Sequence, residues 1–405
     1  MTKKIRLRPI HSYFLLTGIL FLVSLAYLFF TRGASLDQLI FQRGTDHFMD
    51  FFNHIDYVKH HRNVYFESPH ACFPPLIYFM YYVFGHMMPD GMIVRFQAGM
   101  TGGYAYLLYA AYTAVLAVLF AFAVGRFFKD GRISLAVTGT VLFSDLFLFH
   151  VLERGNSVMI VVVLLMLAVS LKDSDSAWKR ELALILIAVA AAVKLYPAVF
   201  GLLYLREKRW KEAIRLTVYG ILLFMLPFLF FGGFEGFTAF LANQQTIQST
   251  AGSGFGSIHS VILWIGEKTG TDLSILSSVL PIAVGGLLIF LTVISKERWV
   301  RLFFLTCIMT LVPFWSGSYT RILFAVPLAV FLSDEERSAE KKSAFGTAAA
   351  LAFGLIFSLF TMAPLRFTSV FQDTPATVVR EAGIFVFMVF LMVRGSVKWI
   401  RSFKK

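Results

Sequence analysis

Long apolar segments alternate with short polar links along most of this chain. A helix that crosses a membrane needs ~20 apolar residues, and segments of about that length recur from one end of the sequence to the other. They cover residues 10–30, 104–126, 134–152, 157–171, 181–205, 213–231, 275–294, 300–316, 319–333, 344–363 and 382–399. The pattern predicts an all-α polytopic membrane protein with about eleven or twelve membrane helices, organised as a single integral-membrane domain over residues 1–405.

The composition agrees with a membrane location. Hydrophobic residues make up 58% of the chain and charged residues only 15%, whereas soluble globular proteins are roughly 45–50% apolar. The net charge of +13 could indicate a nucleic-acid-binding protein, but the basic residues lie in short clusters between apolar segments. That distribution is typical of cytoplasmic loops, so we expect no nucleic-acid partner. The two cysteines, Cys72 and Cys307, match neither a disulfide framework nor a zinc motif.

The basic clusters also predict sidedness. If the N-terminus is cytoplasmic, most of the 37 Lys and Arg residues fall in predicted cytoplasmic segments, and the C-terminus is cytoplasmic too. These segments are 1–9, 126–132, 172–180, 206–215, 296–301, 334–342 and 394–405. Residues 31–103 and 232–274 then form two extracytoplasmic loops.

This sidedness sets two structural conditions. The apolar stretch 74–88 must be a surface or re-entrant helix within the first outer loop, and 181–205 must begin and end in the cytoplasm. We expect 181–205 to be two short helices broken between Lys194 and Pro197, because proline interrupts helical geometry. Irregular backbone at membrane depth is found where protein or a wet cavity surrounds it, so this break, with Tyr196, is a candidate pocket.

The first outer loop concentrates ionisable residues, with three Asp and five His between residues 46 and 70. On a helix, Asp46 and His54 would share a face with Asp50, which lies four residues from each. A partly desolvated carboxylate near a histidine can act as a general base for a hydroxyl; the alternative is the hydrated face of an interfacial helix. His47, His54 and the carboxylates could also ligate a metal, but no HxH or HExxH spacing is present. We therefore expect no metal and no other cofactor.

Three cations are predicted at or within the membrane, where ionisable side chains commonly mark function. Arg154, Lys194 and Arg321 would suit a phosphate, a pyrophosphate or an anionic lipid head group. The alternatives are snorkelling to the interface or an internal ion pair such as Glu153 with Arg154. Two further candidates for a substrate cleft are His259 in the second outer loop and Tyr319 near Arg321.

The order of several short motifs resembles a known family. They are Asp50 in DFFNH, Tyr65, Phe73-Pro74-Pro75, Gly155-Asn156, Lys194 with Pro197, and Arg209-Trp210. Together they resemble the GT-C class of integral-membrane glycosyltransferases, and most closely glycosyltransferase family 87, the polyprenol-phosphate-mannose-dependent mannosyltransferases and their bacterial relatives. A later family motif has a loose counterpart in residues 312–316 and 319–321, where Arg321 stands in place of a frequent histidine.

The resemblance implies an enzyme that moves one sugar, mannose, from a polyprenyl-phosphate donor to an extracytoplasmic glycolipid or polysaccharide acceptor, with inversion. It implies Asp50 as the general base, with Asp46 one helical turn away as the alternative. Lys194, Arg154 and Arg321 are the candidates for binding the donor phosphate. The substrate-cleft candidates are His54, Tyr65, Asn156, Tyr196, His259 and Tyr319. The family also implies a GT-C-like fold in the cytoplasmic (plasma) membrane, with the active site on the extracytoplasmic face.

Two other functions remain open from the sequence. One is a transporter or flippase of a lipid-linked or anionic substrate, although the sequence has no inverted repeat of the kind common in transporters. The other is a polysaccharide polymerase or ligase, in which a large outer loop more often occurs late in the chain.

Overall fold

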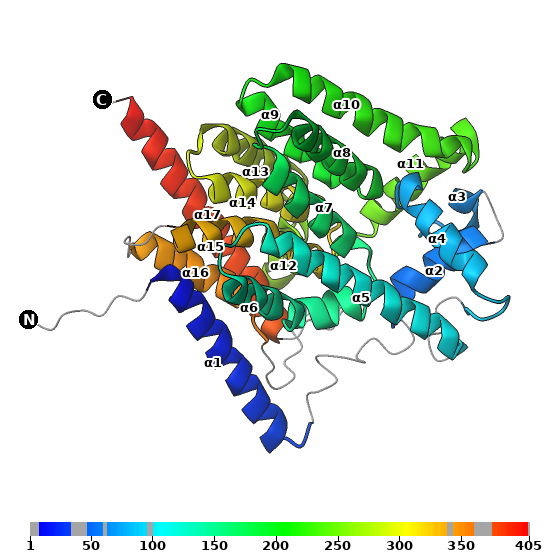
Figure 1. Ribbon diagram of the computed structural model, residues 1–405, viewed down its shortest axis with the longest axis horizontal. Helices are drawn as coiled ribbons and strands as arrows, with labels where there is room; N and C mark the ends of the chain where they lie inside the picture. The colour runs from blue at the N-terminus through cyan, green and yellow to red at the C-terminus, as the bar shows by residue number, and fades with distance from the viewer. Residues whose placement is uncertain are drawn as a thin grey trace, which may run out of the picture. The chain divides into compact units, whose positions relative to one another are not determined.

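The computed structural model describes residues 8–33, 47–59, 63–94, 100–337, 343–359 and 375–403 (Figure 1). All regular secondary structure within these ranges is helical. The all-α class predicted from the hydrophobic pattern is therefore confirmed.

The chain divides into two compact units, each built from separated stretches of sequence. Unit 1 comprises Met1–Ile40, Phe127–His150 and Ser253–Lys405, and unit 2 comprises Phe41–Arg126 and Val151–Gly252. The helices of unit 1 are α1 (Pro9–Phe30), α6 (Gly131–Leu142), most of η4 (Leu146–Leu152), α12 (Ile258–Thr269), α13 (Ser274–Ile294), α14 (Arg298–Leu311), η7 (Ser318–Phe324), α15 (Ala325–Arg337), α16 (Ala344–Ile356) and α17 (Pro375–Ser402). The helices of unit 2 are α2 (Met49–Lys59), α3 (Val64–Glu67), α4 (Pro75–Met87), α5 (Gly103–Gly125), α7 (Val158–Leu171), α8 (Ala177–Val193), η5 (Tyr196–Gly201), α9 (Leu202–Arg206), α10 (Trp210–Met225), η6 (Leu226–Leu229) and α11 (Gly233–Ser249).

Five of the described helices are long and apolar enough to cross a membrane, so the chain is an integral membrane protein. They are α1, α5, α10 with η6, α13 and α17, each at a segment that the hydrophobic pattern predicts. A sixth predicted segment, 134–152, forms α6 and η4, which are bent by 57° and could together make one broken span.

The other predicted membrane segments also contain helices, but these helices are shorter. α7, α14, α15 and α16 have 13 or 14 residues, a length of about 20 Å against a hydrocarbon core of ~30 Å. By length and composition the described residues thus contain five or six spans, whereas the sequence pattern predicts eleven or twelve. α4 likewise has only 13 residues, too few for a complete crossing.

The break predicted in segment 181–205 is present. α8 ends at Val193, and Lys194 has an extended backbone with φ −145° and ψ 127°. A 3-10 helix, η5, then begins at Tyr196 with Pro197 in its first turn, where the absent N–H of proline costs no helical hydrogen bond. The chain therefore changes direction at Lys194, whose side chain is buried within unit 2.

Unit 1 holds two buried ion pairs that originate from consecutive residues of α17. Arg380 Nη1 lies 2.7 Å from Asp145 Oδ2, and Glu381 Oε2 lies 2.7 Å from Arg321 Nε. All four side chains are buried. Because removing one partner of a buried pair leaves an uncompensated charge, these contacts fix α17 to the α6–η4 bend and to η7.

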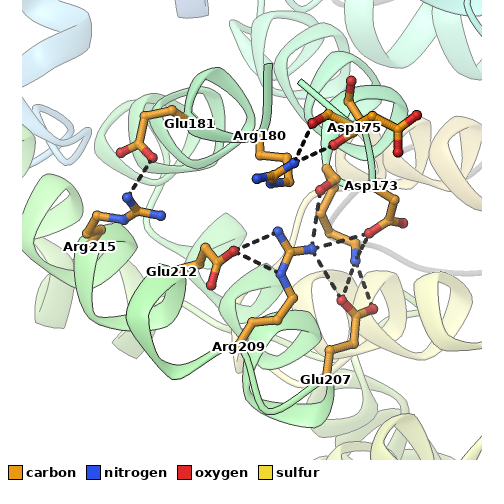
Figure 2. A network of polar contacts seen from close by, with 10 residues as sticks. Asp173, Asp175, Arg180, Glu181, Glu207, Arg209, Glu212 and Arg215 are labelled. Carbon is orange, nitrogen blue, oxygen red and sulfur yellow. Dashed lines mark hydrogen bonds and ion pairs between the residues drawn. The ribbon is translucent and has the colours of Figure 1, made fainter. Parts of the chain in front are cut away.

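In unit 2, a polar network joins the loop between α7 and α8 to the loop between α9 and α10 (Figure 2). Lys172 Nζ lies 2.6 Å from Glu207 Oε2 and 2.7 Å from Asp173 Oδ1. Arg209 binds Glu212 at 3.0 Å and Asp173 at 3.3 Å. Two of the basic residues that the charge distribution places in the cytoplasm, Lys172 and Arg209, are thus paired with acidic neighbours. This network fixes the ends of α7 and α10, between which α8 packs.

Candidate active site

The described part of the predicted first outer loop contains the short helices α2, α3 and α4 of unit 2. α2 begins at Met49, so Asp50 lies in its first turn and His54 one turn later on the same face. A carboxylate is favourable at this end of a helix, because it faces the positive end of the helix dipole. Asp46, the alternative base, lies outside the described residues.

Asp50 is held by the turn that follows η4. Arg154 Nη2 lies 2.8 Å from Asp50 Oδ1, and the Asn156 side-chain amide donates to Asp50 Oδ2 at 2.6 Å. The backbone N–H of Asp50 donates to the Arg154 carbonyl at 3.1 Å. The Asp50 side chain is 13% exposed and the Arg154 side chain 28%. Both carboxylate oxygens of Asp50 therefore have defined partners, and the side chains of Asp50 and Arg154 remain partly exposed.

The 153–156 turn needs glycine at its centre. Gly155 has φ +73°, which side-chain-bearing residues rarely adopt. A Cβ at this position would lie 2.7 Å from the Phe48 carbonyl oxygen. The Phe48 N–H also donates to the Glu153 carbonyl at 2.7 Å. The turn can thus approach the start of α2 closely enough for Asn156 to reach Asp50.

The ion pairing at this turn differs from the alternative considered from the sequence. That alternative joined Glu153 to Arg154, but the structure pairs Arg154 with Asp50, and Glu153 with His47 Nδ1 at 2.9 Å. The two neighbouring side chains thus have different partners, one just before α2 and one in its first turn.

The charges around Asp50 favour its ionised form. Burial alone would raise the pKa of Asp50, but Arg154, the Asn156 hydrogen bond, His54 and Lys194 together hold that pKa below its ordinary value. The group is therefore a carboxylate over the whole physiological pH range, and it can accept a proton.

His54 is a buried, neutral histidine. Its ring stacks on Phe73 with centroids 4.0 Å apart and lies nearly parallel to Tyr81 at 5.6 Å. Its Nδ1 atom is 2.9 Å from the Tyr78 hydroxyl. Burial lowers the pKa of His54 to about 3, although Asp50 acts in the opposite direction. His54 is thus an uncharged aromatic neighbour of the Asp50 carboxylate.

Lys194 enters the same cluster from the break after α8. Its Nζ atom lies 3.3 Å from the centroid of the Phe73 ring, and the residue is buried. Phe73 therefore contacts both His54 and Lys194, and cation–π contacts of this kind are strongest when desolvated. Tyr196, two residues further on, has a buried hydroxyl with no hydrogen-bond partner among the described residues.

Tyr65 supports this arrangement through the backbone. Its hydroxyl donates to the Phe73 carbonyl at 2.9 Å, and the Asn243 amide of α11 donates to the carbonyls of Tyr65 and Ala71. Tyr65 is predicted as a substrate-cleft residue, and its described contacts are those of a residue that positions the Phe-Pro-Pro segment. Asn243 was not among the predicted site residues, since a single amide in a polar, Gly-rich stretch has no distinctive spacing.

The remaining candidates, Arg321, His259 and Tyr319, belong to unit 1, whereas the Asp50 cluster belongs to unit 2. Arg321 is fully buried and donates to the Glu381 carboxylate, the Thr310 carbonyl, the Ser316 and Thr320 hydroxyls and the Gly256 carbonyl. Its guanidinium is thus engaged in an internal ion pair, which is the alternative to phosphate binding.

His259, in the first turn of α12, and Tyr319, in η7, follow closely after the two loop residues that Arg321 joins, Gly256 and Ser316. The His259 ring stacks on Phe314 with centroids 4.7 Å apart, and Tyr319 lies 6.3 Å from Trp315. Within the described residues no three His, Cys, Asp or Glu side chains are arranged to hold a metal ion.

Comparison with known proteins identifies the family of the chain. A family model described as glycosyltransferase family 87 matches residues 72–317, more than half of the chain, which confirms the resemblance drawn from the motifs. The matched region includes Arg154, Asn156 and Lys194 but begins after Asp50. No curated protein and no solved structure matches the chain.

Proposed function

Because the chain belongs to glycosyltransferase family 87, we propose that it transfers a single sugar, mannose, from a polyprenyl-phosphate donor to an extracytoplasmic glycolipid or polysaccharide acceptor. In this proposal the protein lies in the plasma membrane with both termini in the cytoplasm, has a GT-C-like fold, and needs no metal. The active site is the Asp50 cluster of unit 2. A lipid-linked donor is consistent with an enzyme whose chain is largely apolar helix.

The observation that carries the proposal is the grouping of one ordered carboxylate with two cations. Asp50 is fixed by Arg154 at 2.8 Å and by Asn156 at 2.6 Å, and Lys194 is close enough to shift its pKa. A transferase that uses a lipid phosphate needs a base for the acceptor hydroxyl and cations for the phosphate that leaves. The cluster supplies both.

The reaction follows as a single displacement. Asp50 takes the proton of the acceptor hydroxyl while the hydroxyl oxygen attacks the anomeric carbon of the donor. The bond between that carbon and the phosphate oxygen breaks, and the electron pair leaves with polyprenyl phosphate. Lys194 and Arg154 stabilise the added negative charge, and the anomeric configuration inverts.

Arg154 has a double task in this scheme. In the absence of donor it holds Asp50 and keeps the carboxylate a weak base. A donor phosphate would compete for the same guanidinium, since guanidinium binds phosphate and carboxylate with similar geometry. As Arg154 moves toward the phosphate, the pKa of Asp50 rises and the carboxylate becomes a stronger base when donor is bound.

The test is transfer of radiolabelled sugar from polyprenyl-phosphate mannose, and from its glucose and arabinose analogues, to a membrane lipid extract. We expect Asp50→Asn to lower the rate by at least ~10²-fold, the low end of general-base effects. Asp56→Asn, on the same helix α2, is the matched control and should keep most of the activity.

Three results would contradict parts of the proposal. Undiminished transfer by Asp50→Asn, together with loss in Asp46→Asn, would move the base by one helical turn. A product with retained anomeric configuration would exclude a single displacement. Movement of the lipid donor across sealed vesicles without sugar transfer would favour the transporter alternative.

A further inference from the structure

A proline in α13 leaves one backbone carbonyl of unit 1 without its helical partner. In an α-helix the Ser277 carbonyl would accept from the N–H of residue 281, but residue 281 is proline and has no N–H. The side chain of His259 replaces it, with Nδ1 2.9 Å from the Ser277 oxygen.

This contact fixes the tautomer of the neutral imidazole. A carbonyl oxygen only accepts hydrogen bonds, so Nδ1 must carry the hydrogen and, in the neutral ring, Nε2 must carry the lone pair. Nε2 has no partner among the described residues and is not one of their buried unsatisfied polar atoms. His259 therefore presents a hydrogen-bond acceptor outward from the protein interior.

The ring is also held in orientation. One face stacks on Phe314 with centroids 4.7 Å apart and planes 21° from parallel. The Phe314 carbonyl accepts a hydrogen bond from Ser257 Oγ at 2.8 Å, and Ser257 is the N-cap of the helix that carries His259. The imidazole, α12 and the loop at Phe314 thus form one connected unit.

The two loops beside His259 are closely packed around a buried charge. Arg321 donates to the Gly256 carbonyl in one loop and to the Ser316 hydroxyl in the other. A Cβ on Gly256 would lie 2.6 Å from the Ser316 carbonyl oxygen, so the approach requires glycine. Despite this support, residues 312–319 are all partly exposed, including Phe314, Trp315 and Tyr319. The loop is a rigid, accessible aromatic surface.

We propose that Nε2 of His259 and the aromatic loop 312–319 form a binding site for a hydroxyl-bearing sugar ring. A hydrogen-bond acceptor held in a fixed position selects a hydroxyl donor, and aromatic side chains suit the apolar C–H face of a sugar. Binding sites of this kind combine apolar walls with a few placed polar groups. The inference rests on the proposed glycosyl transfer, and the sugar is that of the donor or of the acceptor glycan. His259 is a specificity residue here, not a base.

Two substitutions of His259 separate binding from folding. Asn places its amide N–H near the position of Nδ1, so His259→Asn keeps the bond to Ser277 and removes the outward acceptor. Gln extends its amide to the position of Nε2, so His259→Gln keeps an outward acceptor. His86→Asn is the matched control, because the exposed His86 also contacts a backbone carbonyl, that of Tyr82, through Nδ1 at 2.8 Å.

The kinetic experiment measures KM and kcat separately for polyprenyl-phosphate mannose and for the lipid extract. We expect His259→Asn to raise KM for one of the two by about 3- to 10-fold, the value of one neutral hydrogen bond, with kcat within about twofold. The substrate whose KM changes identifies the source of the sugar. His259→Gln should recover part of the loss, and His86→Asn should behave as wild type.

A binding experiment makes the result independent of catalysis. Saturation-transfer NMR with methyl α-mannoside and methyl α-glucoside on the purified protein should give a signal that His259→Asn weakens and Asp50→Asn retains. If the wild type transfers sugar from none of the donors, the proposed function fails while this readout remains valid. Unchanged KM values and an unchanged NMR signal in His259→Asn would overturn the sugar site, and a loss confined to kcat would assign His259 to the chemistry instead.

Discussion

Replacement of Asn156 by Ala should raise the pKa of Asp50. The lost interaction is the 2.6 Å hydrogen bond from the Asn156 amide to Asp50 Oδ2, and hydrogen bonds to charged groups stabilise them by about 1.5–3 kcal/mol. At 1.36 kcal/mol per unit, this corresponds to a rise of about one to two pKa units. Little discount for solvent is needed, since the Asp50 side chain is only 13% exposed.

The sign of the effect on activity follows from the role of the carboxylate. In the proposed mechanism the base is active when deprotonated, so transfer should be lost as the pH falls through the Asp50 pKa. In the wild type, burial raises that pKa, but Arg154 and Asn156 oppose burial and hold the pKa below its ordinary value. The acid limb of kcat/KM should therefore move upward by about one to two pH units in Asn156→Ala.

The assay is the pH dependence of radiolabelled transfer, with a second variant and a control. Asn156→Asp keeps an acceptor for the Val158 N–H, which Asn156 Oδ1 caps at 3.0 Å, but places a second carboxyl beside Asp50 and should move the limb further. Asn243→Ala removes another buried amide of unit 2, one that serves Tyr65, and should lower stability without moving the limb. An unmoved limb in Asn156→Ala, or an equal shift in Asn243→Ala, would refute the reasoning.

Three further predictions concern stability. Glu381→Gln leaves the fully buried Arg321 without its counter-charge and should destabilise the fold by about 3–5 kcal/mol, seen as a lower melting temperature; no decrease would contradict a structural role for the pair. Gly155→Ala forces a Cβ to 2.7 Å from the Phe48 carbonyl in a left-handed conformation, and should lower both stability and transfer, whereas Gly139→Ala, with open space in a helix, should not. Burial lowers the pKa of His54 from 6.5 to about 3, so on acidification the unfolded chain takes up this proton at a higher pH than the folded protein does. The free energy of unfolding should therefore fall by about 1.4 kcal/mol per pH unit below pH 6.5. His54→Asn should remove that slope in melts recorded between pH 4 and 7, and an unchanged slope would assign it to other groups.

The hydrophobic pattern predicted the elements that depend on local sequence. Full-length helices formed where ~20 apolar residues run together, and the break after Val193 followed from Pro197. Helix length was less well predicted, because a short apolar helix such as α7 and a spanning helix have the same composition per residue. What distinguishes them is the position at which the chain turns, and tertiary contacts determine it.

The partners of charged residues were the least predictable part of the site. Arg154 stands beside Glu153 in the sequence, yet the left-handed turn at Gly155 directs it to Asp50. The partner of Arg321 is Glu381, 60 residues away, and no spacing rule connects them. The orientation of His259 depends on a proline in a different helix. These contacts are set by tertiary packing, which one sequence does not display.

The contact between Asp50 and Asn156 also has a consequence for biosynthesis. The two residues are 106 positions apart, with the spanning helix α5 between them. Joining ends so distant costs on the order of 4 kcal/mol of chain entropy, so the clamp can form only once α5 is inserted and the turn after η4 has been made. Until then the nascent chain carries its carboxylate on a solitary short helix that nothing orients. The proposed base therefore lacks its Asn156 partner until a segment that is translated long after it has been made.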